Sequence, residues 1–213
     1  MNQVIAPARE RHALPQGPGT DGTGGTGYES LPARPLDRRE LRTLVEELAA
    51  DPSRWERQVD FPAEGGRHYA SLHRDSHVDV WLLCWRPGDD TGWHDHDISS
   101  GAVSVVAGAL RECNPRIGGE HVETLIEAGE SFSFGPDHIH RLSGAAEGSV
   151  SIHAYSPPLW RLGQYSIDEG GVMRRVSVSY ADELRPVDPS EEPPGTPDVP
   201  DVPDVPVGEA VPV

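Results

Sequence analysis

From residue 68 to residue 180, the sequence is a succession of short apolar segments interrupted by Gly, Pro or Asp. Segments of this kind, bounded by turn residues, are typical of β-strands. The clearest are HYASLH, VDVWLLCWRPG, GAVSVVAGALRE, HVETLIEAGES, FSFGP, SVSIHAYS and RRVSVSY. Many strands at close spacing predict an all-β domain, a sandwich or barrel with one end left open for a ligand.

One segment before these strands has a different period. Asp37 and Glu40 form the capping box that is typical of a helix N-terminus, and Pro52 lies near the expected end. The apolar residues between them recur at the spacing of a helix that buries one face: Leu41, Leu44, Val45 and Leu48. The sequence therefore predicts a short helical segment on the N-terminal side of the strands.

Both ends of the chain differ in composition from its central part. Residues 1–31 are rich in Gly and Thr and poor in large apolar side chains, so burial cannot offset the entropy cost of ordering them. Residues 186–213 are Pro-rich and acidic and end in PDVPDVPDVPV, which favours extended polyproline II. We predict a disordered arm over 1–31, one folded domain over 32–185 and a disordered acidic tail over 186–213.

Charge and apolar content exclude several classes of partner. The net charge is −17 and Lys is absent, whereas a nucleic-acid surface needs clustered Lys and Arg. No apolar run reaches the roughly 18–20 residues of a membrane helix, and the N-terminus has no signal-peptide pattern. Nothing in the strands marks an apolar patch that demands a partner. We expect a cytoplasmic monomer that binds neither nucleic acid nor membrane.

Histidines are concentrated in two short stretches. His94 and His96 are two residues apart in GWHDHDISS, so an extended strand directs both imidazoles to the same side. Downstream, FSFGPDHIHRLSG supplies His138 and His140 after a Gly-Pro turn. Converging imidazoles are typical ligands of divalent transition metals. The spacing predicts a metal site, with His138 and His140 competing as the third ligand.

The order His-x-His, followed about 40 residues later by another His at a hairpin edge, resembles the two motifs of cupins. Cupins are small β-barrels with a metal at the open end, and most place a Glu four or five residues after the second His. Ser100 and Gly101 stand there in this chain. With His140 as third ligand, three neutral imidazoles leave the ion its full charge and favour a soft anion such as a thiolate. This pattern predicts thiol oxidation.

Several motifs together resemble the cysteine dioxygenase family of cupin thiol dioxygenases over roughly residues 34–180. LLCWRPGDDTGWHDH is similar to the strand that leads into the family's His-Asp-His, and HIHRLSG to the segment with its third ligand. SVSIHAYSPPL is similar to its Ser-x-His-x-Tyr-Ser-Pro-Pro signature, the most specific of the three. The resemblance implies iron(II) bound by His94, His96 and His140. It also implies a hydrogen-bonded relay beside the iron, formed by Ser151, His153 and Tyr155.

The chain departs from the family at two positions. Mammalian members have a Cys at the position of Gly101 that forms a thioether with the active-site Tyr, so Tyr155 is an uncrosslinked phenol here. The family usually has Arg at the position of Ser71, two residues after the Tyr that matches Tyr69, to hold the substrate carboxylate. A Ser hydroxyl replaces neither the charge nor the forked geometry of Arg.

Two explanations for Ser71 remain open. By strand parity Arg67, Tyr69, Ser71 and His73 share one face, so Arg67 or a protonated His73 would reach the substrate. By the same parity Arg74 points away, unless a bulge intervenes. Alternatively, the substrate is another small thiol with a different carboxylate or none.

The resemblance and the residues together predict an iron(II)-dependent dioxygenase that oxidises cysteine or a related small thiol with O2 to the sulfinate. Tyr155 would donate a hydrogen bond to the substrate or to oxygen, while Tyr69, Ser71 and Arg67 would contact the substrate. Two alternatives remain: a cupin metalloenzyme with a non-thiol substrate, and a non-catalytic cupin that senses a ligand and presents its acidic tail to a partner.

Overall fold

The computed structural model describes residues 28–63, 67–116, 119–167 and 172–179. Residues 1–27 of the predicted arm and the whole predicted tail, 186–213, lie outside the described residues. Contacts divide the chain into two units. The first, residues 1–33, has a 3-10 turn at Tyr28–Ser30, and the second, residues 34–213, holds the other described elements.

The second unit is one helix followed by antiparallel strands, which confirms the predicted all-β class with a short N-terminal helical segment. Helix α1 is Arg38–Ala49, and 3-10 turns follow at Pro52–Arg54 and Glu56–Gln58. The strands are β1 (His68–Arg74), β2 (Asp79–Trp85), β3 (Trp93–Asp95), β4 (Ser100–Ala107), β5 (Ala109–Asn114), β6 (Val122–Glu127), β7 (Ser131–Phe134), β8 (Arg141–Gly144), β9 (Ser149–Ser156), β10 (Arg161–Ile167) and β11 (Met173–Ser179).

Helix α1 begins and packs as the sequence predicts. Asp37 accepts hydrogen bonds from the backbone N–H groups of Arg39 and Glu40, and the Glu40 carboxylate accepts from the Asp37 N–H, which completes the capping box. The four predicted apolar residues are all buried. No helix in the described part of the chain has the length and apolarity needed to cross a bilayer.

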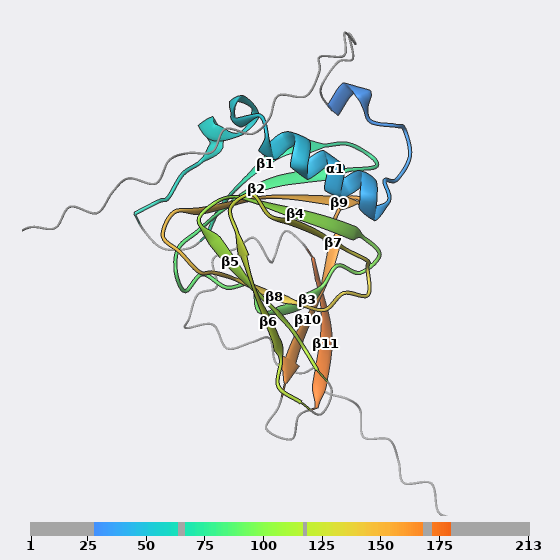
Figure 1. The fold of residues 1–213 in the computed structure, drawn as a ribbon. Helices are drawn as coiled ribbons and strands as arrows, with labels where there is room; N and C mark the ends of the chain where they lie inside the picture. The colour runs from blue at the N-terminus through green and yellow to red at the C-terminus, as the bar shows by residue number, and fades with distance from the viewer. Residues whose placement is uncertain (1–27, 64–66, 117–118, 168–171, 180–213) are drawn as a thin grey trace, which may run out of the picture. The chain divides into compact units, whose positions relative to one another are not determined.

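The largest sheet has the strand order β1-β2-β9-β4-β7, and α1 lies across one of its faces (Figure 1). Side chains alternate between the two faces of each strand. On the central strand β9, Ser151, His153 and Tyr155 share one face. Tyr155 packs with Leu159 and with Leu162 of β10, and β10 lies on the side of the sheet away from α1 (Figure 1). The helix thereby closes one side of the sheet and leaves the relay residues on the other side.

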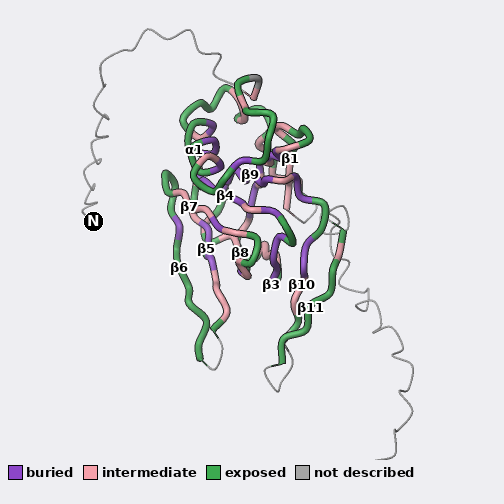
Figure 2. Tube along the Cα trace, turned by 90° about the vertical axis from the view of Figure 1, so that its right-hand side faces the viewer, coloured by how far each residue is buried: buried purple, intermediate pink, exposed green. Residues whose placement is uncertain are grey.

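Two three-stranded sheets, β6-β5-β8 and β11-β10-β3, lie on the side of the large sheet away from α1 (Figure 1). Their hairpins, β5–β6 and β10–β11, extend away from the large sheet as two separate projections (Figure 2). The segment GAVSVVAGALRE, which reads as one strand in the sequence, is two strands in different sheets. Gly108 turns the chain between β4 and β5 with a φ of 65°, a conformation that favours glycine.

Two apolar clusters fill the space between the layers. Each joins residues of the large sheet to residues outside it: Trp85, Val105, Leu110, Ile126 and Leu142 in one, and Val103, Phe134, Tyr155, Leu159 and Leu162 in the other. Phe132 packs against both clusters, and its ring centroid lies 6.5 Å from that of His140. His140 therefore lies beside the residue that contacts both clusters.

Candidate metal centre

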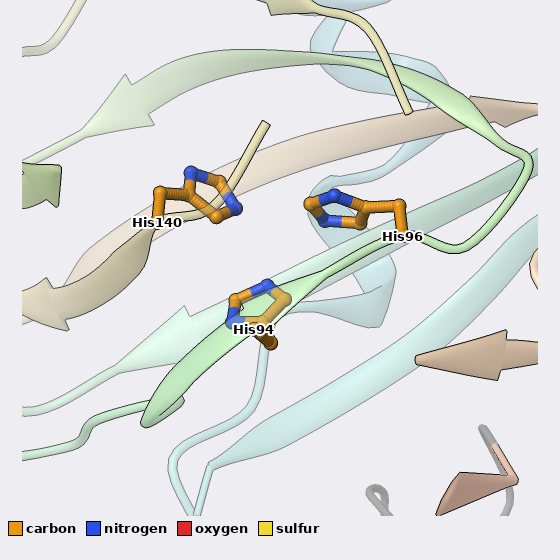
Figure 3. Close-up of side chains that lie close together, drawn as sticks. All are labelled: His94, His96 and His140. Carbon is orange, nitrogen blue, oxygen red and sulfur yellow. The ribbon is translucent and has the colours of Figure 1, made fainter. Parts of the chain in front are cut away.

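Three histidines from two segments converge between the sheets. His94 lies in β3, His96 directly follows it, and His140 directly precedes β8. An antiparallel bridge joins the segments, because the His94 N–H donates to the His140 carbonyl at 2.9 Å and the His140 N–H donates back at 3.0 Å. The ring centroids are 4.7 to 5.1 Å apart. Figure 3 shows the three rings directed toward a common space.

Burial keeps these three imidazoles neutral. His94 is 6% exposed, and His96 and His140 are each 1% exposed. Burial lowers the pKa of all three, and the neighbouring histidines lower the pKa of His94 and His96 further. A neutral imidazole has a nitrogen lone pair available for a metal, whereas an imidazolium has none.

Hydrogen bonds select which nitrogen faces the cluster. His94 Nδ1 donates to the Gly92 carbonyl at 3.1 Å, and His140 Nδ1 donates to Glu112 Oε1 at 2.9 Å. Both bonds leave Nε2 as the lone-pair nitrogen. Within the described residues, His140 Nε2 and both nitrogens of His96 are buried without a hydrogen-bond partner. Buried polar atoms normally have a partner, so these orphaned nitrogens fit a three-histidine metal site.

Glu112 of β5 supports the third histidine, and sequence reasoning missed it. Its Oε1 accepts hydrogen bonds from His140 Nδ1 at 2.9 Å and from His138 Nε2 at 2.8 Å. Burial raises the pKa of Glu112, but these two bonds outweigh burial and lower the pKa to about 2. Glu112, His138 and His140 also form a possible ligand group. His138 Nε2 bonds to Glu112, and His138 is not part of the group formed by His94, His96 and His140.

The predicted relay residues form a continuous hydrogen-bonded chain on β9. Ser151 Oγ is 2.8 Å from His153 Nε2, and His153 Nδ1 is 3.2 Å from the Tyr155 hydroxyl. Trp85 of β2, which sequence reasoning did not include, donates from Nε1 to Ser151 Oγ at 2.8 Å. Burial, with the charges of His140 and Arg67, lowers the pKa of His153 to about 3, so this histidine is neutral and carries one proton.

The Trp85 contact favours one direction for the chain of hydrogen bonds. An indole N–H only donates, so Ser151 Oγ is an acceptor at that end. The Ser151 hydrogen is then available for donation to His153 Nε2, and when it is used in this way the single ring proton of His153 lies on Nδ1. In this arrangement Nδ1 donates to the Tyr155 oxygen, and the hydroxyl hydrogen of Tyr155 is directed away from His153.

The predicted substrate-contact residues lie along β1 and just before it. Tyr69 and Ser71 pair with Leu83 and Trp81 of β2, which pair in turn with Ser151 and His153. Cross-strand partners share a face, so Tyr69 and Ser71 are on the relay side of the sheet. Tyr69 is half-buried and Ser71 is exposed.

Of the candidate cations, Arg67 is the one whose charge reaches the cluster. Its Cζ lies 5.2 Å from the centroid of the Trp85 ring, and its charge contributes to the lowered pKa values of His94 and His153. Arg67 therefore provides positive charge beside both the predicted ligands and the relay.

The face assigned to His73 from strand parity is wrong. A bulge between Ser71 and His73 pairs His73 with Val80, on the face opposite to Ser71, and His73 Nε2 lies 3.2 Å from Asp75 Oδ2. The same bulge turns Arg74 to the face of Asp79, whose buried carboxylate accepts from Arg74 at 2.9 Å. Arg74 is thus neutralised by an ion pair.

Comparison with known proteins identifies the family. A family model described as cysteine dioxygenase type I matches residues 31–168, well over half of the chain. The chain belongs to the cysteine dioxygenase family. This match confirms the resemblance carried by the His-Asp-His and Ser-x-His-x-Tyr motifs.

Solved structures of other proteins show a more distant likeness. KdgF from a Halomonas species is 16% identical, with a TM-score of 0.40, and the match covers 46% of this chain and 84% of that one. A Klebsiella pneumoniae protein with a double-stranded β-helix domain is 14% identical, with a TM-score of 0.42 and coverages of 56% and 91%. An oxalate oxidase is 14% identical, with a TM-score of 0.41 and coverages of 52% and 61%.

The mammalian-type crosslink of the cysteine dioxygenase family has no room here. A Cβ placed on Gly101 would lie 2.4 Å from Cε2 and Cζ of Phe134 and 3.1 Å from Cδ1 of Tyr155. Phe134 is held between two imidazoles, with ring centroids 4.5 Å from His96 and 5.1 Å from His138. The Phe134 ring therefore occupies the space that a cysteine at position 101 would need.

We expect Gly101→Cys to form no thioether with Tyr155 and to destabilise the protein by about 1–3 kcal/mol, because the side chain overpacks a closed site. Intact mass after incubation with iron, thiol and O2 would show the loss of two hydrogens if the crosslink formed, and thermal unfolding measures stability. The double variant Gly101→Cys with Phe134→Ala, which clears the space, is the control. A single variant that crosslinks with unchanged stability would contradict the packing argument.

Proposed function

We propose that this protein is an iron(II)-dependent dioxygenase that oxidises a small thiol with O2 to the sulfinate. Family membership supports the reaction class. The observation that carries the proposal is the cluster of three buried neutral histidines, with no carboxylate directed at the same space among the described residues. We further propose a monomer, because one chain supplies all the site residues. A cytoplasmic location agrees with the cysteines, since Cys84 and Cys113 are both free thiols.

His94, His96 and His140 are the proposed iron ligands. Three neutral donors leave the ion its full positive charge, which favours binding of a thiolate over a neutral group. Bound iron would supply the redox chemistry by which electrons pass from the thiolate sulfur to O2. Both oxygen atoms then end on sulfur, so thiolate and O2 give a sulfinate without a further reductant.

Ser151, His153 and Tyr155 are the proposed catalytic relay. In this proposal Trp85 and Ser151 keep the His153 proton on Nδ1, and His153 orients the Tyr155 hydroxyl; the distances from Trp85 to Ser151, Ser151 to His153 and His153 to Tyr155 support it. The hydroxyl donates to the substrate or to oxygen as negative charge develops there. All three relay residues are at least 93% buried, so bulk water does not compete for these hydrogen bonds.

Arg67, Tyr69 and Ser71 are the proposed substrate contacts. Ser71 stands where the family usually has an arginine, and Arg74 forms an ion pair with Asp79. The charge of Arg67, by contrast, helps to lower the pKa values of His94 and His153. Arg67 would therefore bind the carboxylate of the thiol substrate in place of an arginine at position 71. Cysteine and 3-mercaptopropionate both have such a carboxylate.

The proposal is tested by oxygen uptake of iron-loaded protein with cysteine, 3-mercaptopropionate, cysteamine and mercaptosuccinate, and by mass spectrometry of the product. We expect one O2 consumed per sulfinate formed with at least one carboxylated thiol. No uptake with any thiol at full iron occupancy would contradict the proposal and favour a non-thiol cupin enzyme. Ligand binding without uptake would favour a sensor.

We expect Arg67→Met to raise the KM for a carboxylated thiol by about 10–100-fold, because it removes a charge-assisted hydrogen bond worth about 1.5–3 kcal/mol. The KM for cysteamine, which has no carboxylate, should change little. Arg67→Lys keeps the charge and serves as the matched control, with an intermediate KM. Equal losses for cysteamine and for the carboxylated thiols would rule out the carboxylate contact.

A further inference from the structure

Asp95 is the last residue of β3, lies between His94 and His96 in the sequence, and has an extensive set of hydrogen bonds. In an extended strand its side chain points away from those of His94 and His96, on the opposite face. The carboxylate is buried, with the residue 6% exposed. It accepts from Arg175 Nε at 2.7 Å, Arg175 Nη2 at 2.9 Å and the Tyr165 hydroxyl at 2.6 Å. The backbone N–H groups of Gly163 and Asp97 also donate to it.

These bonds join β3 to the hairpin β10–β11. Strand β3 has only three residues, and it pairs with β10 through Asp95↔Gly163, His94↔Gln164 and Trp93↔Tyr165. On its other side, the described contact is the single bridge between His94 and His140. The position of both histidines therefore depends on how β3 is held by the hairpin.

Gly163 gives the Arg175 side chain access to Asp95. A Cβ on Gly163 would lie 2.2 Å from Arg175 Nε and 2.5 Å from Asp95 Oδ2. Such distances are far below van der Waals contact, and the atoms concerned belong to a bidentate ion pair rather than to a loose side-chain end. Any side chain at position 163 would displace Arg175 or Asp95.

The Asp95 carboxylate depends on these partners. Arg175 donates two charge-assisted hydrogen bonds to it, and the Tyr165 hydroxyl donates a third. The Arg175 side chain is 37% exposed and the Asp95 side chain 9%, so removing Arg175 would leave a buried carboxylate without its cation. Loss of Arg175 would therefore shift Asp95, and with it the backbone that carries the two histidines.

We propose that Arg175 is a positioning residue of the metal centre, which acts through Asp95 to set the relative orientation of His94 and His96. The inference rests on the proposed role of these histidines as ligands. Arg175 lies in β11, beyond residues 31–168 that the family model matches, so the family match does not supply this role. In this chain the C-terminal hairpin would form part of the metal centre.

The test uses full-length protein and Co(II), whose absorption spectrum reports ligand geometry. Affinity is measured by competition with a chelator, and stability by thermal unfolding of metal-free protein. We expect Arg175→Met to lower Co(II) affinity at least about tenfold and to alter the spectrum, as changes behind metal ligands do. Arg175→Lys should fall between Arg175→Met and the parent. Arg111→Met is the control on the other hairpin, where it removes an exposed cation whose Nε lies 3.8 Å from Glu123 Oε2. It should change neither the Co(II) affinity nor the spectrum.

Tyr165→Phe and Gly163→Ala test the same contacts of Asp95 in case Arg175→Met does not fold. The first removes one hydrogen bond to Asp95, and the second adds only the clashing Cβ, so both should shift the Co(II) spectrum in the same direction as Arg175→Met. Folded variants with parental affinity and spectrum, even if less stable, would reduce Arg175 to a structural anchor. If the parent protein itself bound no Co(II) or Fe(II), the ligand assignment and this inference would both fall. Metal binding without sulfinate formation would overturn the proposed function alone.

Discussion

His96→Leu is expected to abolish tight metal binding and at the same time to stabilise the metal-free protein. His96 is 1% exposed, and within the described residues neither ring nitrogen has a hydrogen-bond partner. An unsatisfied buried polar group costs about 1–3 kcal/mol, and an apolar side chain of similar volume removes that cost. We expect the free energy of unfolding of the metal-free protein to rise by about that amount.

His140→Leu is the matched comparison, because it removes a ligand whose other nitrogen is used. His140 Nδ1 donates to Glu112, so the substitution also deprives a buried carboxylate of one of its two histidine donors. We expect this variant to be less stable than the parent by about 1–3 kcal/mol. The two variants thus differ in the sign of their stability change although both lose a ligand.

Both variants should bind divalent metal about 100–1,000-fold more weakly, since a ligand in a structural zinc site contributes roughly 2.5–4 kcal/mol when the total is divided over four ligands. Chelator competition gives the affinity, and chemical denaturation of protein stripped of metal gives the stability. Equal destabilisation by both substitutions would mean that His96 has a structural partner in the metal-free state. Unchanged affinity would remove His96 from the ligand set.

The sequence contains the local features of this fold but not the contacts between distant segments. The helix over residues 38–49 follows from its capping box and apolar period, both of which act within a few residues. Strand β10, by contrast, was not predicted, because Gly163 and Gln164 interrupt its apolar pattern. Those two residues pair with Asp95 and His94, so the strand is specified by its partner more than by its own composition.

The candidate site shows the same division. His94 with His96, and the three relay residues, are predictable because they recur at spacing two along an extended segment, which places side chains on one face. His140 lies in a distant segment, and the family resemblance singles it out. The supporting residues, by contrast, are far in the sequence from their partners, and no short motif marks them. Glu112 is 28 residues from His140, Trp85 is 66 from Ser151, and Arg175 is 80 from Asp95. The bulge after Ser71 is equally invisible in the sequence, and it reverses the faces of His73 and Arg74.

Tyr155→Phe is expected to lower kcat about 100–10,000-fold, the range typical of losing a positioned proton donor. The substitution removes only the hydroxyl, and the ring remains packed with Phe134 and Leu159 in the apolar cluster. Metal affinity and the KM for the thiol should therefore stay close to those of the parent. Oxygen uptake over a range of thiol concentrations separates the two constants, and chelator competition checks the metal.

Ser151→Ala distinguishes a directed relay from a lone tyrosine. Without Ser151, His153 loses the donor to Nε2 that keeps its proton on Nδ1, and the ring is free to adopt the other tautomer and accept from Tyr155. The Tyr155 hydrogen would then point at His153 for part of the time, so kcat should fall about tenfold, less than in Tyr155→Phe. The double variant should be no slower than Tyr155→Phe alone, because both changes act through one hydroxyl. Additive losses would show that Ser151 acts independently of Tyr155, and turnover by Tyr155→Phe within a few-fold of the parent would exclude the phenol as a donor.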